Sequence, residues 1–268
     1  MTLRPAAAGS GIRFVRTDLP GGVEIPAAWD SVVDTRLCTV LGAQGATVGT
    51  VEHLMAALVA YGVDNAVIDI DGPEIPIMDG SASAFAFMLD CAGVVAQGRP
   101  RRVLRVLKEV SVAEGGKRAT LSPAEGRVFA LGIEFPSAAI GHQRREFDLD
   151  RGAFRTEIAW ARTFGFLHEV EALRAAGLAR GGSLDNAIVI DGDRVLNEGG
   201  LRYRDEFVRH KLLDSIGDLG LAGGAIIGRF EGVRTGHALN NLVLRRLFAD
   251  RDAWCWEEKV PEDVRLAA

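Results

Sequence analysis

Apolar residues in the first third of the chain recur at two different spacings. Over residues 51–62 they fall at helical spacing, with Thr50 before them as an N-cap and Gly62 after them as a stop signal. The run AVIDID (66–71) predicts a strand, the proline-bearing stretch 73–80 a loop, and residues 81–93 a second helix. A strand therefore lies between two helices in this part of the chain.

Strand-like and helical patterns also alternate in the remaining two thirds. The segments RVLRVLKEVSVAEG, KRATLSPAEG and VFALGIEF predict an antiparallel meander over about 102–135. Residues 156–166 end as a strand or loop. The further predicted elements are helix 170–178, strand 186–191, helix 205–219, strand 225–233 and a helix over ALNNLVLRRLFAD (238–250).

The sequence changes character near residue 100, where QGRPRRVLRV combines glycine, proline and four arginines. A chain of 268 residues exceeds the usual size of a single core, so two domains are expected. We place them at 1–100 and 101–268. Because strand runs and helix pairs occur in both halves, the predicted fold class is α+β with two layers in each domain.

Composition narrows the functional classes. The chain is 48% hydrophobic and 25% charged with a net charge of −5, which is typical of a soluble globular protein and does not favour nucleic-acid binding. It has no apolar run long enough to span a bilayer and no leader pattern. The three cysteines are widely spaced, which does not predict a disulfide framework. We expect a cytoplasmic protein.

The stretch DEFVRHKLLDSIGD (205–218) is the first candidate for chemistry. His210, Asp214 and Asp218 are spaced four apart and share one face of the predicted helix. The apolar stripe comprises Val208, Leu212, Ile216 and Leu219. Taken alone, the polar line is typical of a solvated face with a His–Asp pair worth about 0.2–0.5 kcal/mol. The alternative is that a histidine nitrogen and a carboxylate oxygen one turn apart bind the same metal.

Glu52 and His53 are the second candidates, in the first turn of a predicted helix. The helix dipole there favours a carboxylate and disfavours a protonated imidazole, and a metal ligand must be a neutral imidazole. Glu52 would then stand next to a ligand, able to accept a proton from water at the metal. Considered separately, an acid at a helix start and a single histidine are common and need no function.

His237 is the third candidate, in GHALNN where a strand ends and a helix begins. It could be a helix-start residue with a local hydrogen bond. It could also present its imidazole to a cleft as a general acid, with Asp218 accepting its second N–H and fixing the tautomer.

Together these candidates predict more than each does alone. Two histidines and one carboxylate leave a metal with open coordination, which is typical of a catalytic site. The same ligands also suit a non-haem iron oxygenase, so Zn2+ and Fe2+ both remain possible. An acid beside one ligand and a spare histidine favour metal-assisted hydrolysis.

The residues also resemble a known family, the zinc-dependent UDP-3-O-acyl-N-acetylglucosamine deacetylases of bacterial lipid A synthesis. The matching segments cover nearly the whole chain and include TVEHLMAAL, EIPIMDGSA, ARTFGF, GGSLDNAIV, RVLNEGGLRYRDEFVRHKLLDSIGDL and TGHALNN. The resemblance implies two βααβ two-layer sandwich domains packed through their helices, each with a small insert, and an active site between them. It also implies cleavage of the N-acetyl group of the UDP-linked acylated amino sugar, giving the free amine and acetate in the committed step of lipid A biosynthesis.

The resemblance assigns roles residue by residue. The implied zinc ligands are His53, His210 and Asp214. The other implied catalytic residues are Glu52 as general base, His237 as general acid, Asp218 as the partner that orients His237, Thr163 as a support for the oxyanion, and Lys211 beside the metal.

Substrate-binding positions also follow from the resemblance. The implied acyl-chain passage comprises Phe164, Val170, Ala179, Ser183, Leu184 and Val189, which from the residues alone would be ordinary core. Arg234 stands where the family pattern has a lysine near the nucleotide diphosphate. Arginine keeps the positive charge and adds a planar fork of donors.

The chain departs from the family pattern at its start. Family members usually begin with an extra strand pair and a glycine-rich turn, and here about twenty residues of that pattern are absent, as judged from typical hairpin sizes. We expect an unpaired sheet edge and an incomplete wall of the acyl passage. An alternative function follows: a shortened, weakly active homologue that binds the acylated UDP-sugar or a regulatory partner. We expect a monomer.

Overall fold

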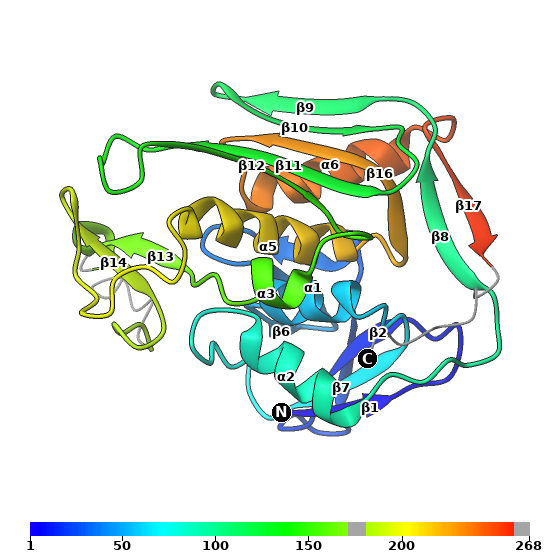
Figure 1. The fold of residues 1–268 in the computed structure, drawn as a ribbon. Helices are drawn as coiled ribbons and strands as arrows, with labels where there is room; N and C mark the ends of the chain where they lie inside the picture. Colours follow the sequence, from blue (N-terminus) through cyan, green and yellow to red (C-terminus); the bar gives the residue numbers. More distant parts are fainter. Residues whose placement is uncertain (171–180, 260–268) are drawn as a thin grey trace.

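Two large sheets enclose a double layer of helices. The structure is a computed structural model that describes residues 1–170 and 181–259. Figure 1 shows the helices lying between a sheet built from the first hundred residues and a sheet built from later residues. The mixed α+β class is thereby confirmed, while the division at residue 100 stays a prediction.

The first sheet has the strand order β1–β7–β2–β3. Its strands are β1 (Thr2–Pro5), β2 (Ile12–Arg16), β3 (Val23–Pro26) and β7 (Ala66–Ile70). β7 runs parallel to β2 and antiparallel to β1. Phe14 and Ile68 of this sheet are completely buried in the same apolar cluster as Leu54 of the neighbouring helix. The strand predicted over 66–71 is confirmed.

The second sheet corrects the predicted meander. Its strands are β8 (Arg101–Val106), β9 (Val110–Glu114), β10 (Lys117–Ser122), β11 (Arg127–Glu134), β12 (His142–Asp148), β16 (Ala225–Val233) and β17 (Trp254–Lys259). β9 and β10 form a hairpin, but β16 lies between β10 and β11 and runs parallel to β11 and to β8. The meander was predicted because strands joined by short connections usually pair with each other. In the structure β16, which comes much later in the chain, is inserted between β10 and β11.

The remaining elements are two small sheets and the helices. The small sheets are β4 (Val32–Asp34), β5 (Val40–Ala43) and β6 (Ala46–Val48), and β13 (Phe164–Phe166), β14 (Ile188–Asp191) and β15 (Arg194–Val195). The helices are η1 (Trp29–Ser31), α1 (Glu52–Ala60), α2 (Ser83–Ala92), α3 (Phe154–Glu157), α5 (Glu206–Gly220) and α6 (His237–Ala249). Most of the helix predicted over 170–178 lies outside the described residues. Among the helices that are described, none has the length and apolarity needed to cross a bilayer.

The start of α1 differs from the prediction. Thr50 is not its N-cap, because Val51 takes that position and no side chain caps the helix. Thr50 instead has a φ of 58°, a left-handed conformation that is rare for a β-branched residue. Its hydroxyl donates to Oε1 of Glu74 at 2.6 Å, which holds this bend directly before the helix. The stop signal at Gly62 is confirmed by its φ of 70°.

Helix α5 is buried on nearly all sides. Its apolar stripe is buried as predicted, but so are His210, Asp214 and Asp218, so the interpretation of a solvated polar face is wrong. Helix α1 packs against this face of α5 at very short range. A Cβ added at Gly217 would lie 2.0 Å from the backbone oxygen of Glu52, so this crossing requires glycine.

Gly217→Ala is therefore expected to destabilise the fold by about 1–3 kcal/mol, because the added methyl group meets backbone that cannot rotate away. This cost should exceed the gain of up to about 1 kcal/mol that alanine offers within a helix. Urea unfolding would measure the difference. The matched control is Gly220→Ala on the same helix, where the added Cβ would meet the side-chain Cγ2 of Val59 at 2.5 Å. Equal stabilities of the two variants would contradict the close crossing as the cause.

Candidate metal centre and active site

Three buried side chains from α1 and α5 converge on one point. His53 lies in the first turn of α1, and His210 and Asp214 lie one turn apart on α5. Oδ1 of Asp214 is 3.6 Å from Nε2 of His53 and 3.3 Å from Nε2 of His210. The potential ligand atoms of all three lie within 4.8 Å of one another. This is a candidate metal site, assembled from two residues that the helical spacing singled out, His210 and Asp214, and from His53, which was a candidate because of its place at a helix start.

His210 is held in the form that binds a metal. Its Nδ1 lies 3.0 Å from the carbonyl oxygen of Ala161, and because a carbonyl only accepts, Nδ1 carries the proton. The lone pair is then on Nε2, which faces Asp214. Burial lowers the pKa of His210 to about 3, so the imidazole is neutral at physiological pH. A backbone carbonyl that fixes the tautomer of a metal-binding histidine is a common arrangement.

Asp214 provides the test of whether a metal fits. Its Oδ2 accepts a hydrogen bond of 3.0 Å from Nζ of Lys211, but in the described part of the chain no donor bonds to its buried Oδ1. Burial acts to raise the pKa of Asp214, yet His210 and Lys211 outweigh burial and hold it well below its usual range. Lys211 occupies only Oδ2, so the buried Oδ1 that faces two imidazole nitrogens is left as the free ligand atom that a metal ion would satisfy. The donor set of two nitrogens and one oxygen fits a divalent metal.

His237 and Asp218 form a second buried pair next to these residues. Nδ1 of His237, the first residue of α6, donates to Oδ2 of Asp218 at 2.9 Å. Asp218 also accepts from Asn240 Nδ2 at 2.8 Å. Burial alone would lower the pKa of His237, but the carboxylates of Asp218 and Glu52 outweigh it and raise this pKa to about 9. His237 is therefore protonated at neutral pH and can donate a proton.

Glu52 faces the other nitrogen of His237. Its Oε1 is 3.8 Å from Nε2 of His237, and its Oε2 accepts a 3.1 Å hydrogen bond from the backbone N–H of Thr39. Burial raises the pKa of Glu52, although His237 and His53 act against it. Thr39 was not among the predicted residues, since a single threonine before a short strand has no distinguishing pattern. Its contacts alone place it at the site.

Lys211 and Phe164 lie next to the ligands, whereas Thr163 belongs to the segment whose Ala161 carbonyl holds His210. Nζ of Lys211 is 5.6 Å from the centre of the Phe164 ring, which is 6.2 Å from that of His210. Thr163 follows Ala161 by two residues, and its backbone N–H donates to the carbonyl oxygen of Gly80 at 2.8 Å. The segment that fixes His210 is thus anchored to the loop predicted over 73–80.

The other predicted substrate-binding positions lie further along this segment. Val189 is in β14, Val170 packs beside Gly165 of β13, and Ser183 and Leu184 are exposed. Ala179 lies outside the described residues. Figure 1 shows this small sheet projecting at one side of the molecule. A role for these residues in holding an acyl chain stays a prediction.

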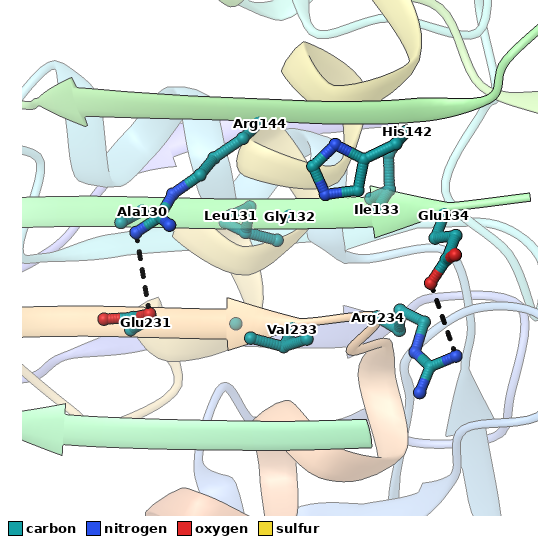
Figure 2. Close-up of a pocket in the computed structure, with 11 residues that line it drawn as sticks. Ala130, Leu131, Gly132, Ile133, Glu134, His142, Arg144, Glu231, Val233 and Arg234 are labelled. Atoms are coloured by element: carbon teal, nitrogen blue, oxygen red, sulfur yellow. Dashed lines mark ion pairs between the residues drawn. The ribbon is translucent and has the colours of Figure 1, made fainter. Parts of the chain in front are cut away.

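Arg234 lies in a charged groove on the second sheet, built from residues of β11, β12 and β16 (Figure 2). Nη1 of Arg234 is 3.5 Å from Glu134 Oε2, and Arg144 Nη2 is 3.7 Å from Glu231 Oε1. His142 lines the groove between these pairs. Since Arg234 precedes His237 by three residues, one end of the groove lies next to the loop that leads into the buried site.

The sequence of this chain matches a known protein family over most of its length. A family model described as LpxC, UDP-3-O-acyl N-acetylglycosamine deacetylase, matches residues 1–249. A UDP-3-O-acyl-N-acetylglucosamine deacetylase of Phenylobacterium zucineum is 58% identical over 95% of this chain and 87% of its own length. Proteins of the same name from Xanthomonas oryzae pv. oryzae and Stenotrophomonas maltophilia are 51% and 52% identical, each over 96% of this chain and 85% of their own length.

Proposed function

This chain belongs to the UDP-3-O-acyl-N-acetylglucosamine deacetylase family, and from that premise we propose how its buried residues carry out the reaction. The reaction is hydrolysis of the N-acetyl group of UDP-3-O-acyl-N-acetylglucosamine to the free amine and acetate, in lipid A biosynthesis. The packing of α1 on α5 between two sheets supports the finer architecture of two βααβ sandwich domains joined through their helices.

His53, His210 and Asp214 would hold the metal, and the observation that carries this assignment is the unpartnered Oδ1 of Asp214 between two imidazole nitrogens. We propose Zn2+, which accepts two nitrogens and one oxygen and leaves a position free, while Fe2+ suits the same ligands. When bound, the metal supplies Lewis acidity toward the acetyl carbonyl and toward water.

Glu52 is the proposed general base. Its Oε1 lies 3.8 Å from Nε2 of His237, while Oε2 is anchored by the N–H of Thr39. A carboxylate with a raised pKa accepts the proton of an attacking water more readily than an ordinary glutamate does. The buried setting keeps it from exchanging that proton freely with solvent.

His237 is the proposed general acid. Asp218 accepts the Nδ1 proton, so the Nε2 proton is the one available to the departing amine nitrogen. Thr163 and Lys211 would stabilise negative charge on the acetyl oxygen, the first through its hydroxyl and the second as an ammonium beside Asp214.

Binding of the remaining substrate involves the two surfaces next to the site. Arg234 provides a cation for the nucleotide diphosphate at the end of the groove in Figure 2. Phe164 begins the apolar path proposed for the acyl chain, because its ring lies beside His210 and Phe207.

Acetate release from UDP-3-O-acyl-N-acetylglucosamine tests this function. The purified protein should release one acetate per amine formed, lose the activity after chelation and regain it with Zn2+. The same sugar nucleotide without its 3-O-acyl chain serves as the control and should react far more slowly. Substrate binding without acetate release from the metal-loaded protein would favour the binding-only alternative.

The pH dependence follows from His237. Because the acid form is required and its pKa is about 9, kcat should fall roughly tenfold per unit as the pH rises above that value. Asp218→Asn removes the largest charge that raises this pKa, so the alkaline decline should begin at a lower pH in the variant. Rate profiles from pH 6 to about 10.5 would measure both. An alkaline limb that does not move in Asp218→Asn would exclude His237 as its origin.

A further inference from the structure

Thr39 connects three parts of the active site although it lies in none of the helices that build it. It precedes β5 and is 1% exposed. Its hydroxyl donates to Oδ1 of Asp218 at 2.6 Å, and its N–H donates to Oε2 of Glu52 at 3.1 Å. Its carbonyl oxygen accepts from the N–H of Val51, the N-cap of α1, at 3.5 Å. All of its polar groups are thus used at the site.

These contacts matter because Glu52 and Asp218 are buried carboxylates on opposite sides of the same imidazole. Nδ1 of His237 is 2.9 Å from Asp218, and Nε2 is 3.8 Å from Glu52. Two such carboxylates repel each other unless fixed donors compensate their charges. Thr39 supplies one donor to each and thereby fixes their separation, whereas Asn240 reaches only Asp218.

We propose that Thr39 is a positioning residue for the deacetylation. Its hydroxyl holds Asp218, and Asp218 in turn holds the imidazole of His237. Its backbone N–H holds Glu52, so the general acid and the general base are fixed relative to each other. This inference rests on the proposed function. With so little exposed surface, Thr39 is shielded from substrate, so it acts through these partners. A misplacement of about 1 Å among reacting groups can cost about a hundredfold in rate.

The test compares Thr39→Val, which keeps the shape and removes the hydroxyl, with Thr39→Ser, which keeps the hydroxyl. Thr39→Val should lower kcat by about 10- to 100-fold with KM and bound zinc little changed, and Thr39→Ser should recover most of the rate. The backbone N–H to Glu52 is present in all three proteins. A wild-type kcat in Thr39→Val, or no recovery in Thr39→Ser, would overturn the proposal.

A double-mutant cycle separates positioning from general support of the fold. In a His237→Ala background, Thr39→Val should cost much less than it does in the native protein, because its effect passes through Asp218 to His237. If Thr39→Val lowers kcat by the same factor in both backgrounds, Thr39 has a merely structural role and the proposal is overturned. If Thr39→Val does not fold, Thr39→Ala takes its place in the cycle.

A spectroscopic measurement keeps this inference separate from the proposed function. The Nδ1 proton that His237 shares with Asp218 should give an imidazole N–H resonance in NMR spectra of the protein without substrate. The proposal expects this resonance to shift or broaden in Thr39→Val and to persist in Thr39→Ser. This test does not depend on acetate release. An unchanged resonance in Thr39→Val overturns the positioning role, and a shifted or broadened resonance supports it, whether or not the protein releases acetate.

Discussion

Glu52→Gln is expected to bind zinc as the native protein does and to lose about 10²- to 10⁴-fold in kcat, the usual contribution of a positioned general base. Glutamine has the same length and can still accept the N–H of Thr39 through its amide oxygen, so the position of the side chain should be preserved. The amide cannot take a proton from water. Because the substrate-binding surfaces are untouched, KM should change little.

Measurement of kcat together with zinc content would establish this assignment. Glu109→Gln is a suitable control, since it makes the same chemical change at an exposed glutamate in the connection between β8 and β9. Native turnover in Glu52→Gln would remove Glu52 from the mechanism. Loss of both turnover and zinc would instead show that Glu52 supports the metal site next to His53.

The helix that carries most of the site could be predicted because two periodic patterns coincide on it. The apolar stripe predicted a helix over 205–219, close to the observed bounds of α5. The spacing of four between His210, Asp214 and Asp218 placed these groups on one face of it. What the periodicity could not give is the surroundings of that face. A polar line facing solvent and a polar line facing α1 and α6 have the same spacing, and only the fold distinguishes them.

Other features were not predictable because they depend on contacts between distant residues. Thr39 bonds to residues 13 and 179 positions further along the chain, and no local pattern marks such a threonine. The place of β16 between β10 and β11 is equally non-local. Gly217 is visible in the sequence as a glycine inside a predicted helix, but the backbone that it accommodates, that of Glu52, belongs to another element.

The wrong prediction at Thr50 has a definite physical reason. A threonine before a helical pattern is a frequent N-cap because its hydroxyl can bond the first free backbone N–H groups. Here the hydroxyl is taken by Glu74, and the backbone adopts a φ of 58°. A strained bend directly before Glu52 and His53 is consistent with the tendency of strain to occur at functional sites.

Asp214→Asn is expected to abolish both zinc binding and activity, whereas Asp218→Asn should retain zinc and lose only rate. The two acids lie on the same helix, one turn apart, and are 3% and 2% exposed, so burial cannot explain a difference between them. Only Asp214 directs an unpartnered oxygen toward His53 and His210, whereas Asp218 is occupied by Thr39, Asn240 and His237. Replacing a residue that hydrogen-bonds to a metal ligand typically costs about 10–100-fold in metal affinity, so loss of a ligand itself should cost more.

Two measurements separate ligand loss from misfolding. The first is the zinc content per chain after dialysis, and the second is the unfolding midpoint of each metal-free variant. The metal-free Asp214→Asn protein should unfold at a lower midpoint than the metal-free native protein, because the Lys211 ammonium loses its carboxylate partner, so the effect of zinc is read against the metal-free midpoint of each protein. Addition of zinc should raise the midpoint of the native protein and of Asp218→Asn, since a ligand that binds only the folded state stabilises it. It should leave Asp214→Asn unchanged. If the two variants instead retain zinc equally, the metal is not held where α1 crosses α5, and the roles assigned to Glu52 and His237 around it would have to be abandoned as well.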